Sequence, residues 1–523
     1  MTITPASLAA VNGVTVENQQ FAVTAAVVPQ KNLIIGTYDE ATYGAGLANI
    51  PIRVFSAEDV GSRTGFGHML HRLARAAFRA GTVETWIVPQ LEGGSDPDQA
   101  EGEIDFTPSG GISAGTAALY IAGERVALAV SAGALPADIA DDFVDLIMAD
   151  ETLPVFATAL AGVLTLTAKS GGTWGNQITL QFSLNYGEAL PTGMVVVMDA
   201  VLSGGVGVPD IQDALDAIGT GDAQNEENFT NVIHGYGIDT ATLDALSIYN
   251  GVGNTEVGNY KKEVARPFRS LVGDTVVGIA GKAAAIGAAA ARRTDRTNGL
   301  VCAPGSPNHP QEIAAQCVGV MAVTNSTRAE ETYIDKELVS IYPGVMADRW
   351  TNNYDDRDAA VRAGVSTTMA KNGVLTIQNL ITFYRPADVA PESNGYRAMR
   401  NISIIQNLLY NYRMNFERSK WKGITIVEDT SAVSNVTSRL KARDVGSVLD
   451  DLVALADIFA GNAWLYTASY TKSELQKGDK VTLRAGLTGF DIIFPVILSG
   501  EGGIYNTVIT FDTSIAILLS GGA

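Results

Sequence analysis

Apolar residues in the first part of the chain follow two different spacings. Residues 33–35 and 86–88 form short apolar runs, which predict two buried strands. Between them, apolar positions recur at helical spacing and predict a helix from about Gly67 to Arg79, ended by Gly81. The apolar face of this helix consists of Leu70, Leu73, Ala74, Ala77 and Phe78. Strand, helix and strand in this order predict an α/β unit.

A different pattern occupies residues 92–227. Gly, Asp and Pro concentrate in residues 92–108, which predicts a linker or an insertion boundary. After it the pattern predicts a hairpin (119–121 and 126–130, around Gly123 and Glu124), an acidic helix (137–148) and two more strands (163–167 and 178–184). These elements together favour a small α+β module inserted into the α/β fold.

Strand and helix alternate again from residue 229. The pattern predicts strands at 232–233 and 300–301, and helices near Leu243, at 276–291 and at 313–321. Such alternation predicts a partly parallel sheet. Residues 367–369 and 374–384 then face each other across Asn372 and Gly373, a strong hairpin-turn signal.

The last third of the chain begins with two predicted helices and continues with strands. The first helix has an apolar face of Met399, Ile402, Ile405, Leu409, Tyr412 and Phe416. The second has an apolar face of Val445, Val448, Leu449, Leu452, Ala456 and Phe459. Gly461 is expected to end the second helix. Strands are predicted at 464–470, 481–487 and 491–498.

One more strand is predicted at the end of the chain, behind a hinge formed by Gly500, Gly502 and Gly503. Its residues alternate so that Tyr505, Thr507, Ile509, Phe511, Thr513 and Ile515 share a face. A lone terminal strand cannot satisfy its own backbone groups, so it must join a sheet in its own subunit or in a neighbour. The neighbour option predicts inter-subunit β-augmentation through Tyr505, Ile509, Phe511, Ile515 and Ile517.

Charge is distributed very unevenly along the 523 residues. The net charge is −20, and residues 92–227 alone hold 21 acidic side chains against Arg125 and Lys169. Residues 396–443 hold nine basic side chains against three acidic ones. This basic segment is either a solvated helix face or a docking surface for an acidic protein, with Arg413, Arg418, Lys420 and Lys422 as candidates. The overall acidity argues against direct contact with nucleic acid.

Secretion and membrane insertion are not expected. Residues 1–30 contain no Lys or Arg, so a signal peptide is not indicated. The apolar stretch 276–291 is too short for a span and contains Lys282, which favours a buried helix. Cys302 and Cys317 match no metal or redox spacing and are predicted to be core residues of a protein folded under reducing conditions, although proximity in the fold could still pair them.

No pattern in the chain predicts catalysis, a metal or a cofactor. Residues 111–115 match G-x-S-x-G around Ser113, but a turn precedes them and a hairpin follows, where the nucleophile pattern needs a strand and a helix. Residues 278–283 resemble a phosphate-binding loop but lack the Ser or Thr after Lys282. His68 and His71 lie one helical turn apart without an indicated third ligand. We therefore expect no enzyme.

Several separate stretches occur in an order that indicates a family. In the N-terminal part these are 29–36 (PQKNLIIG), 67–78 (GHMLHRLARAAF) and 85–89 (TWIVP). In the middle they are 119–123 (LYIAG), 164–169 (LTLTAK) and Gly175-Asn176. Further on they are 342–344 (YPG), 381–384 (ITFY) and the long helix after it. Together they resemble the contractile tail sheath proteins of tailed phages, in particular the Mu-like subgroup.

The resemblance implies a fold class of conserved α/β core, inserted β-rich module, C-terminal α+β domain and terminal strands for β-augmentation. The implied domains are an N-terminal arm (1–20), the first part of the α/β core (21–91), an outward-facing acidic insertion (92–227), a middle α/β sheath domain (228–385), a C-terminal inner domain (386–502) and a C-terminal strand arm (503–523). In this family the α/β region has a protease-like fold without protease activity.

The function that the resemblance implies is structural. Subunits would polymerise as stacked rings around an inner tail tube in the virion and contract to drive the tube through the host envelope, after assembly in the host cytoplasm. The implied partners are further copies of the chain, the tube protein, and baseplate and tail terminator proteins. The basic candidates would then meet the tube or a neighbouring subunit. Two alternatives remain open: the sheath of a headless contractile device (tailocin or secretion type), and an α/β serine hydrolase.

Overall fold

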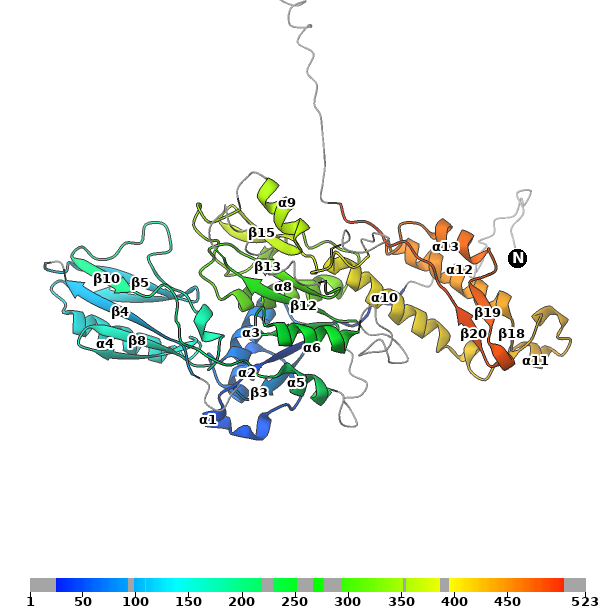
Figure 1. The fold of residues 1–523 in the computed structure, drawn as a ribbon, viewed down its shortest axis with the longest axis horizontal. Helices are drawn as coiled ribbons and strands as arrows, with labels where there is room; N and C mark the ends of the chain where they lie inside the picture. The colour runs from blue at the N-terminus through cyan, green and yellow to red at the C-terminus, as the bar shows by residue number, and fades with distance from the viewer. Residues whose placement is uncertain are drawn as a thin grey trace, which may run out of the picture. The chain divides into compact units, whose positions relative to one another are not determined.

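The computed structural model describes residues 25–92, 98–108, 110–218, 229–251, 267–276, 294–350, 354–385 and 395–502 (Figure 1). They fold into two compact units that divide at Asn411, inside helix α10 (Met399–Phe416). The larger unit runs from Val27 to Tyr410 and includes residues 500–502, and the smaller unit holds residues 25–26 and 411–499. Both units contain helices and sheets, so the prediction of a mixed α/β protein is confirmed at this level.

The described residues of the larger unit build a nine-stranded sheet. In spatial order it contains β14 (Glu337–Leu338), β16 (Val374–Asn379), β15 (Val365–Lys371), β13 (Asn298–Cys302), β12 (Arg269–Asp274), β11 (Asn231–His234), β1 (Lys31–Thr37), β3 (Glu84–Gln90) and β2 (Ile52–Val54). The strands from β15 to β3 pair in parallel, whereas β14, β16 and β2 are antiparallel. The predicted partly parallel sheet is confirmed.

Helices cover both faces of this sheet, because successive residues of a strand point to opposite faces. Leu271 and Val301 belong to one apolar cluster, to which α3 and α8 contribute. Val272 and Leu300, their neighbours in sequence, belong to a second cluster with Leu243 of α6. The helices of this part are α1 (Glu40–Tyr43), α2 (Ala57–Thr64), α3 (Met69–Arg79), α5 (Ile211–Ile218), α6 (Thr240–Asn250), α8 (Pro310–Asn325) and α9 (Tyr354–Arg362).

The turn between β15 and β16 has the geometry that its sequence predicts. Asn372 and Gly373 have φ of 51° and 81°, the positive values that a two-residue hairpin turn needs. The second strand is shorter than predicted, since β16 ends at Asn379 and Ile381 makes only an isolated bridge with Ala398.

Cys302 and Cys317 are both buried, as expected, and burial raises the pKa of the Cys317 thiol to about 12.

The acidic segment (residues 92–227) forms two sheets of its own beside the nine-stranded sheet (Figure 1). One contains β10 (Met194–Met198), β4 (Glu101–Pro108), β8 (Val163–Ala168) and β7 (Val155–Leu160), the other β6 (Glu124–Val130), β5 (Gly115–Ile121) and β9 (Leu180–Phe182), with α4 (Pro136–Ala149) packed on both. Phe106 of β4 and Phe143 of α4 stack in the shared core, 5.6 Å apart between ring centroids.

The prediction of a linker over residues 92–108 is wrong for its second half. Glu101–Pro108 is strand β4, which pairs with β8 on one side and β10 on the other. Buried Ile104 and Phe106 alternate there with exposed Glu103 and Asp105. This period of two outweighs the loop-like composition of the segment.

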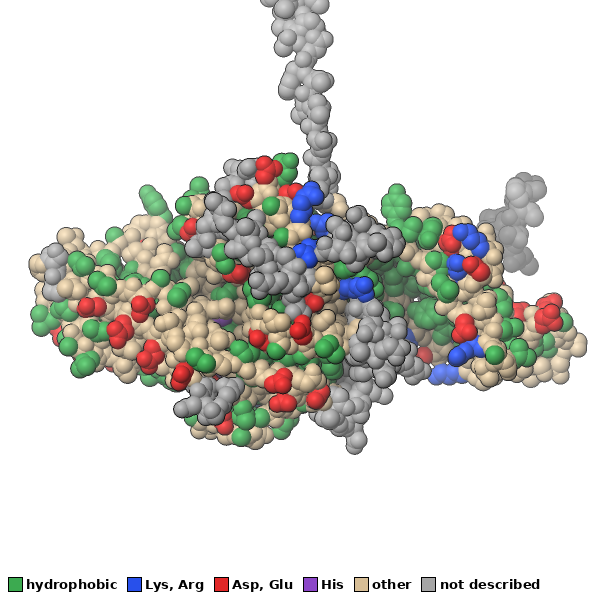
Figure 2. Space-filling model, viewed as in Figure 1, with side chains coloured by type: hydrophobic (Ala, Val, Ile, Leu, Met, Phe, Trp, Pro, Cys, Tyr) green, Lys and Arg blue, Asp and Glu red, His purple; other side chains and the backbone are tan. Residues whose placement is uncertain are grey.

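The acidic segment carries its charge at the surface. Asp138, Asp141, Asp142 and Asp145 are all exposed on α4. Figure 2 shows acidic side chains scattered over the visible face of this segment. The acidic charge of α4 therefore lies at the surface.

The smaller unit combines the end of α10 with short helices and two small sheets. Its elements are η5 (Ser419–Trp421), β17 (Thr425–Ile426), η6 (Thr430–Ala432), α11 (Val436–Arg439), β18 (Ala442–Arg443), α12 (Val445–Gly461), α13 (Ala468–Leu475), β19 (Val481–Leu483), η7 (Ala485–Leu487) and β20 (Phe490–Ile492). Val448 and Leu452 of α12 pack with Leu475 and Val481 in its core. The two long helices predicted for the C-terminal third are confirmed.

The strand predicted at 464–470 is wrong. Helix α13 begins at Ala468, because the Thr467 side chain accepts a hydrogen bond from Ser469 N and caps the first turn. Thr471 and Leu475, one turn apart, are its buried positions. The strands predicted at 481–487 and 491–498 are shortened to β19 and β20. Gly486 adopts a φ of 76° inside the turn η7, which lies between the two strands.

Several predictions lie outside the described residues. These are the N-terminal arm, the helix at 276–291 beyond Val276, Gly503, and the terminal strand with Tyr505, Ile509, Phe511, Ile515 and Ile517. The domain boundaries stay predictions. Among the helices that the structure describes, none is both long and apolar enough to cross a lipid bilayer.

Candidate functional site

The carboxyl ends of β1, β3 and β11 meet at one edge of the nine-stranded sheet. The chain passes from β1 to β3 on one side and returns to β11 on the other side of β1. In open α/β sheets, ligands bind outside the strand ends at such a reversal of strand order. The space outside the carboxyl ends of β1, β3 and β11, called the crevice below, is therefore the first place where an enzymatic site is expected.

Packed side chains fill this crevice. Trp174 of the acidic segment stacks on His309, the N-cap of α8, with 3.6 Å between ring centroids. The backbone of Gly235, just after β11, is so close to its neighbours that an added Cβ would lie 2.3 Å from Met69 Sδ and 3.2 Å from the Trp174 ring. The space that a ligand would need at these strand ends is occupied.

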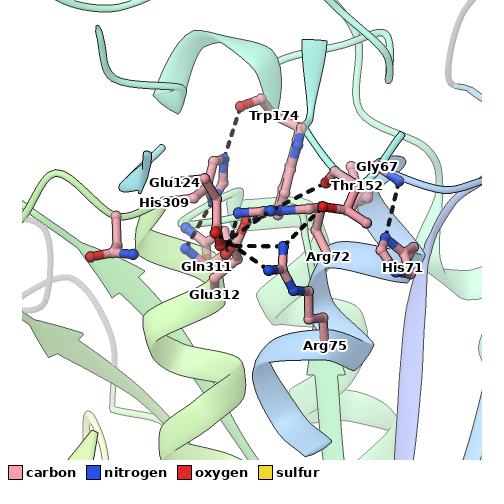
Figure 3. A network of polar contacts seen from close by, with 12 residues as sticks. Gly67, His71, Arg72, Arg75, Glu124, Thr152, Trp174, His309, Gln311 and Glu312 are labelled. Atoms are coloured by element: carbon pink, nitrogen blue, oxygen red, sulfur yellow. Dashed lines mark hydrogen bonds and ion pairs between the residues drawn. The ribbon is translucent and has the colours of Figure 1, made fainter. Parts of the chain in front are cut away.

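His309 is held in its neutral form. Its Nε2 donates to the Trp174 carbonyl at 3.1 Å, and its Nδ1 accepts from Gln311 N at 3.2 Å (Figure 3). Burial lowers the pKa of His309 to about 3, although the bond to Trp174 opposes the shift. The imidazole ring of His309 therefore stays neutral near pH 7 and serves to fill the crevice.

A charged cluster beside this stack joins the acidic segment to the α/β sheet (Figure 3). Arg72 of α3 is fully buried and donates to both carboxylate oxygens of Glu312, at 2.7 Å and 2.9 Å. Glu312 lies in the first turn of α8. Burial alone would lower the pKa of Arg72, but Glu312 and Glu124 outweigh it and raise that pKa. This is the bidentate geometry in which an arginine and a carboxylate bind most strongly.

Glu124, the first residue of β6, brings the acidic segment into the same cluster. Arg72, Arg75 and Arg79 share one face of α3, and their nitrogens lie 3.5, 3.3 and 3.0 Å from Glu124 Oε1. Thr152, in a second turn of the acidic segment, accepts hydrogen bonds from Arg72 and Arg75 at 3.3 and 3.4 Å. Burial raises the pKa of Glu124, but the three arginines outweigh it and hold the pKa below its usual value.

Replacing Glu124 with glutamine is expected to destabilise the larger unit by about 1–2 kcal/mol at pH 7, because three arginines lose a charged acceptor. The folded pKa is lowered, so this contribution is present above the unfolded pKa of about 4.3 and is lost as pH falls through the folded pKa. Urea unfolding measures the effect. Glu103→Gln on the exposed face of β4 is the matched control, expected within about 0.5 kcal/mol of wild type. Equal losses in both variants would contradict the role given to Glu124.

The sequence predictions miss this cluster. The sequence does indicate the basic half of the cluster, because the spacing of Arg72, Arg75 and Arg79 places all three on one face of a helix. Local spacing does not indicate which carboxylates bind these arginines. Glu124 and Glu312 lie 52 and 240 residues from Arg72 along the chain, so only the fold brings them together.

Ser113, the candidate nucleophile of the hydrolase alternative, lies in an exposed loop. Its N–H donates to the Thr192 carbonyl at 2.9 Å, and strand β5 follows it where a nucleophile elbow needs a helix. The local structure therefore lacks the turn that would present a serine for catalysis.

His68 and His71 do not form a metal site with other described residues. His71 Nδ1 accepts from Gly67 N at 3.0 Å, and His68 Nε2 lies 4.0 Å from Asp39 Oδ2. Within the described ranges, no set of three His, Cys, Asp or Glu side chains is placed to hold a metal ion. Both rings belong to the packed start of α3.

The basic docking candidates lie in the smaller unit, and two of them have acidic partners. Arg413 contacts Glu417 at 2.6 Å, and Lys420 contacts Asp451 at 2.6 Å. Arg418 and Lys422 are exposed. Their role in docking stays a prediction.

A hairpin of the smaller unit is a candidate acceptor for a further strand. Among the described residues, β19 and β20 pair only with each other, so each presents one open edge. Leu483, Leu487 and Ile493 are exposed on or beside this hairpin. Open edges with exposed apolar side chains favour the addition of another strand.

The start of the predicted hinge is described in the larger unit. Gly500 has open space around the position of a Cβ, and Glu501 accepts a hydrogen bond from the Thr332 hydroxyl. Gly502 is the last described residue. The hinge itself stays a prediction.

A curated protein similar to this chain is the Mu-like prophage FluMu tail sheath protein of Haemophilus influenzae. The two are 25% identical over 393 residues, which cover 73% of this chain and 74% of that protein. The chain is a tail sheath homologue. The resemblance predicted from the sequence is thereby confirmed.

Solved structures similar to this tail sheath homologue are also sheath proteins. One is the crystal structure of a sheath tail protein from Desulfitobacterium hafniense, with a TM-score of 0.42, 13% identity, and coverage of 91% of this chain and 94% of that chain. Another is the contracted helical sheath of the anti-feeding prophage, with a TM-score of 0.41, 10% identity, and coverage of 97% and 100%. These TM-scores are below 0.5, so the homology rests on the sequence relative. No protein-family model matches the chain.

Proposed function

We propose that this chain is a structural subunit of a contractile tail sheath. It polymerises as stacked rings around an inner tail tube, and contraction of the rings drives the tube through the host envelope for genome delivery. The observation that carries the proposal is the homology to a tail sheath protein over 393 residues. Assembly in the host cytoplasm and contacts with tube, baseplate and tail terminator proteins belong to the same proposal.

A structural role agrees with the chemistry of the described residues. The chain is a structural protein and not an enzyme, as its tail sheath homology indicates. In an α/β sheet, a ligand is expected where the strand order reverses. In this chain the stacked rings of Trp174 and His309 occupy that place. Contraction of a polymer needs only rigid-body movement between two packings, without a nucleotide.

Strand exchange is the proposed link between subunits. The terminal strand (503–523) would leave through the hinge at Gly500, Gly502 and Gly503 and add to the open hairpin β19–β20 of a neighbouring copy. Backbone hydrogen bonds would then hold adjacent subunits while their folded units move. The acidic segment would face outward, where like charges keep separate sheaths apart.

Removal of residues 504–523 is expected to abolish polymerisation and leave monomers, whereas the full-length chain forms tubes visible by electron microscopy. A subtler variant is Ile509→Asp with Phe511→Asp, which charges the predicted pairing face. Thr510→Asp, on the opposite face, is the matched control and is expected to assemble. Tubes of equal length with and without the strand would refute its role, and a full-length chain that never polymerises would refute the sheath proposal itself.

A further inference from the structure

One edge of the four-stranded sheet in the acidic segment is open. Among the described residues, β10 pairs only with β4 (Figure 1). Phe106 N of β4 donates to the Gly162 carbonyl, on the β8 side. Successive residues of an antiparallel strand bond to alternate sides, so Val196, which lies opposite Phe106, turns its N–H and C=O away from β4. Met198, opposite Ile104, does the same.

The open part of this edge is confined to β10. Just beyond it, Leu180 N donates to the Ala200 carbonyl at 2.9 Å. Leu202 N then donates to the Ile178 carbonyl at 3.0 Å, so the chain that follows β10 is paired. The five residues of β10 match the usual length of a strand in a sheet, which is enough for a further strand to pair with them.

The opposite edge of the same sheet is protected. There Ala157 N of β7 donates to Met148 Sδ of α4 at 3.5 Å. Lys169 lies over the ring of Phe156, with 5.4 Å between its Nζ and the ring centroid. A covered N–H and a nearby positive charge are usual means by which an edge strand avoids pairing with other chains. Strand β10 has no charged residue, no proline and no bulge, so it lacks these means of protection.

The solvent-facing side of β10 carries valines, and carboxylates lie directly behind them. Val195 and Val197 are 42% and 65% exposed. Asp105 of β4 pairs with Val197, and Glu103 lies two residues away on the same exposed face. A lysine or arginine on an added strand would lay its apolar stem over a valine and direct its charge toward the carboxylate behind it. The face therefore favours a strand with basic side chains.

Neither end of this chain has the composition that fits the open edge. Residues 1–30 and 504–523 contain no Lys or Arg. The β10 strand of a second copy would bring another acidic segment to the same place, and like charges oppose that contact. Charge complementarity therefore points to a basic segment of a different protein.

We propose that β10 is a docking site that binds a basic, extended segment of another protein by β-augmentation. The backbone groups of Val196 and Met198 hold the segment, and the carboxylates of Glu103 and Asp105 select its charge. This site goes beyond the proposed function, because polymerisation of the chain does not require it. Its binding can be measured whether or not the chain forms tubes.

Fluorescence anisotropy with the full chain tests the site, and the probe is a dye-labelled peptide of alternating valine and lysine. The peptide is expected to bind, and to bind less tightly as the NaCl concentration rises. Two control peptides are expected to bind at least about tenfold more weakly, a difference of about 1.4 kcal/mol. One has glutamate in place of lysine, and the other has proline in place of the central valine, which removes a backbone donor. Equal binding of the lysine peptide and either control would overturn the proposal.

Variants of the chain locate the binding site. Val196→Pro removes an outward N–H, a change that an edge strand tolerates, and is expected to weaken binding about tenfold. Ala159→Pro is the matched control on the opposite edge, because the N–H of Ala159 also faces outward there, and it is expected to bind like wild type. Equal affinities of these two variants would overturn the role of β10.

The charge-reversed variant Glu103→Lys with Asp105→Lys decides the matter if Val196→Pro does not fold. Both side chains are exposed, so this variant is expected to keep the circular dichroism spectrum of wild type and to bind the lysine peptide about tenfold more weakly. Unchanged affinity would contradict the selection of charge. Wild-type dimers that Val196→Pro abolishes and that salt strengthens would show that β10 pairs with a second copy, which would also overturn the proposal.

Discussion

Replacing Arg72 with methionine is expected to destabilise the larger unit by about 3–5 kcal/mol. Methionine has a similar length and fills the space, but Glu312 is then left as a buried carboxylate without its bidentate partner. Arg72 and Glu312 have 0% and 2% of their side-chain surface exposed, so water cannot replace the lost bonds. Urea unfolding followed by circular dichroism measures the loss.

Two controls separate the buried charge from the loss of a side chain. Arg125→Met removes a partly exposed arginine that contacts Glu188 at 2.8 Å and is expected to cost less than about 1 kcal/mol. The double variant Arg72→Met with Glu312→Leu removes both charges and is expected to recover much of the lost stability. A single Arg72→Met variant as stable as wild type would show that the pair is not a structural charge pair.

Acidification from pH 7 to pH 5 is expected to destabilise the chain strongly, because all four of its histidines are buried in the neutral form. Burial lowers the pKa of His68 and His234 to about 4 and that of His71 and His309 to about 3. An unfolded histidine has a pKa of about 6.5, so between these values the unfolded chain binds more protons. Stability therefore falls as the pH falls below about 6.5.

Each histidine contributes to this fall in the free energy of unfolding, by at most about 1.4 kcal/mol per pH unit between its folded and its unfolded pKa. Three carboxyl groups act in the opposite direction, because burial raises the pKa of Glu92, Asp274 and Glu312. They take up protons in the folded state as the pH falls toward 4 and reduce the net loss.

Urea midpoints at pH 7, 6 and 5 measure this dependence. His234→Leu is the sharpest variant, since neither ring nitrogen of His234 has a hydrogen-bond partner within the described structure. This variant is expected to reduce the change of the free energy of unfolding with pH by about a quarter, while its stability at pH 7 stays nearly unchanged. Identical midpoints at pH 7 and pH 5 for the wild-type chain would contradict the neutral, buried state of the histidines.

Local periodicity predicted most elements near their observed places. The helix with Leu70 and Leu73 on one face is α3, and the Asn372-Gly373 turn joins β15 to β16. The errors arose where composition and local pattern disagreed. Residues around Ile104 look like a loop by composition but alternate as a strand. Residues 464–470 start with an apolar run that favours a strand, but the cap at Thr467 starts a helix within them.

The sequence by itself determined most of the helices and strands, the placement of the acidic charge along the chain and the resemblance to tail sheath proteins, because each depends on neighbouring residues or on their order. Only the tertiary structure decided that Trp174 fills the crevice and that Glu124 and Glu312 bind Arg72. The physical reason is separation along the chain. These groups lie from 52 to 240 residues apart, and no local spacing specifies which distant side chains a fold will bring within hydrogen-bond distance.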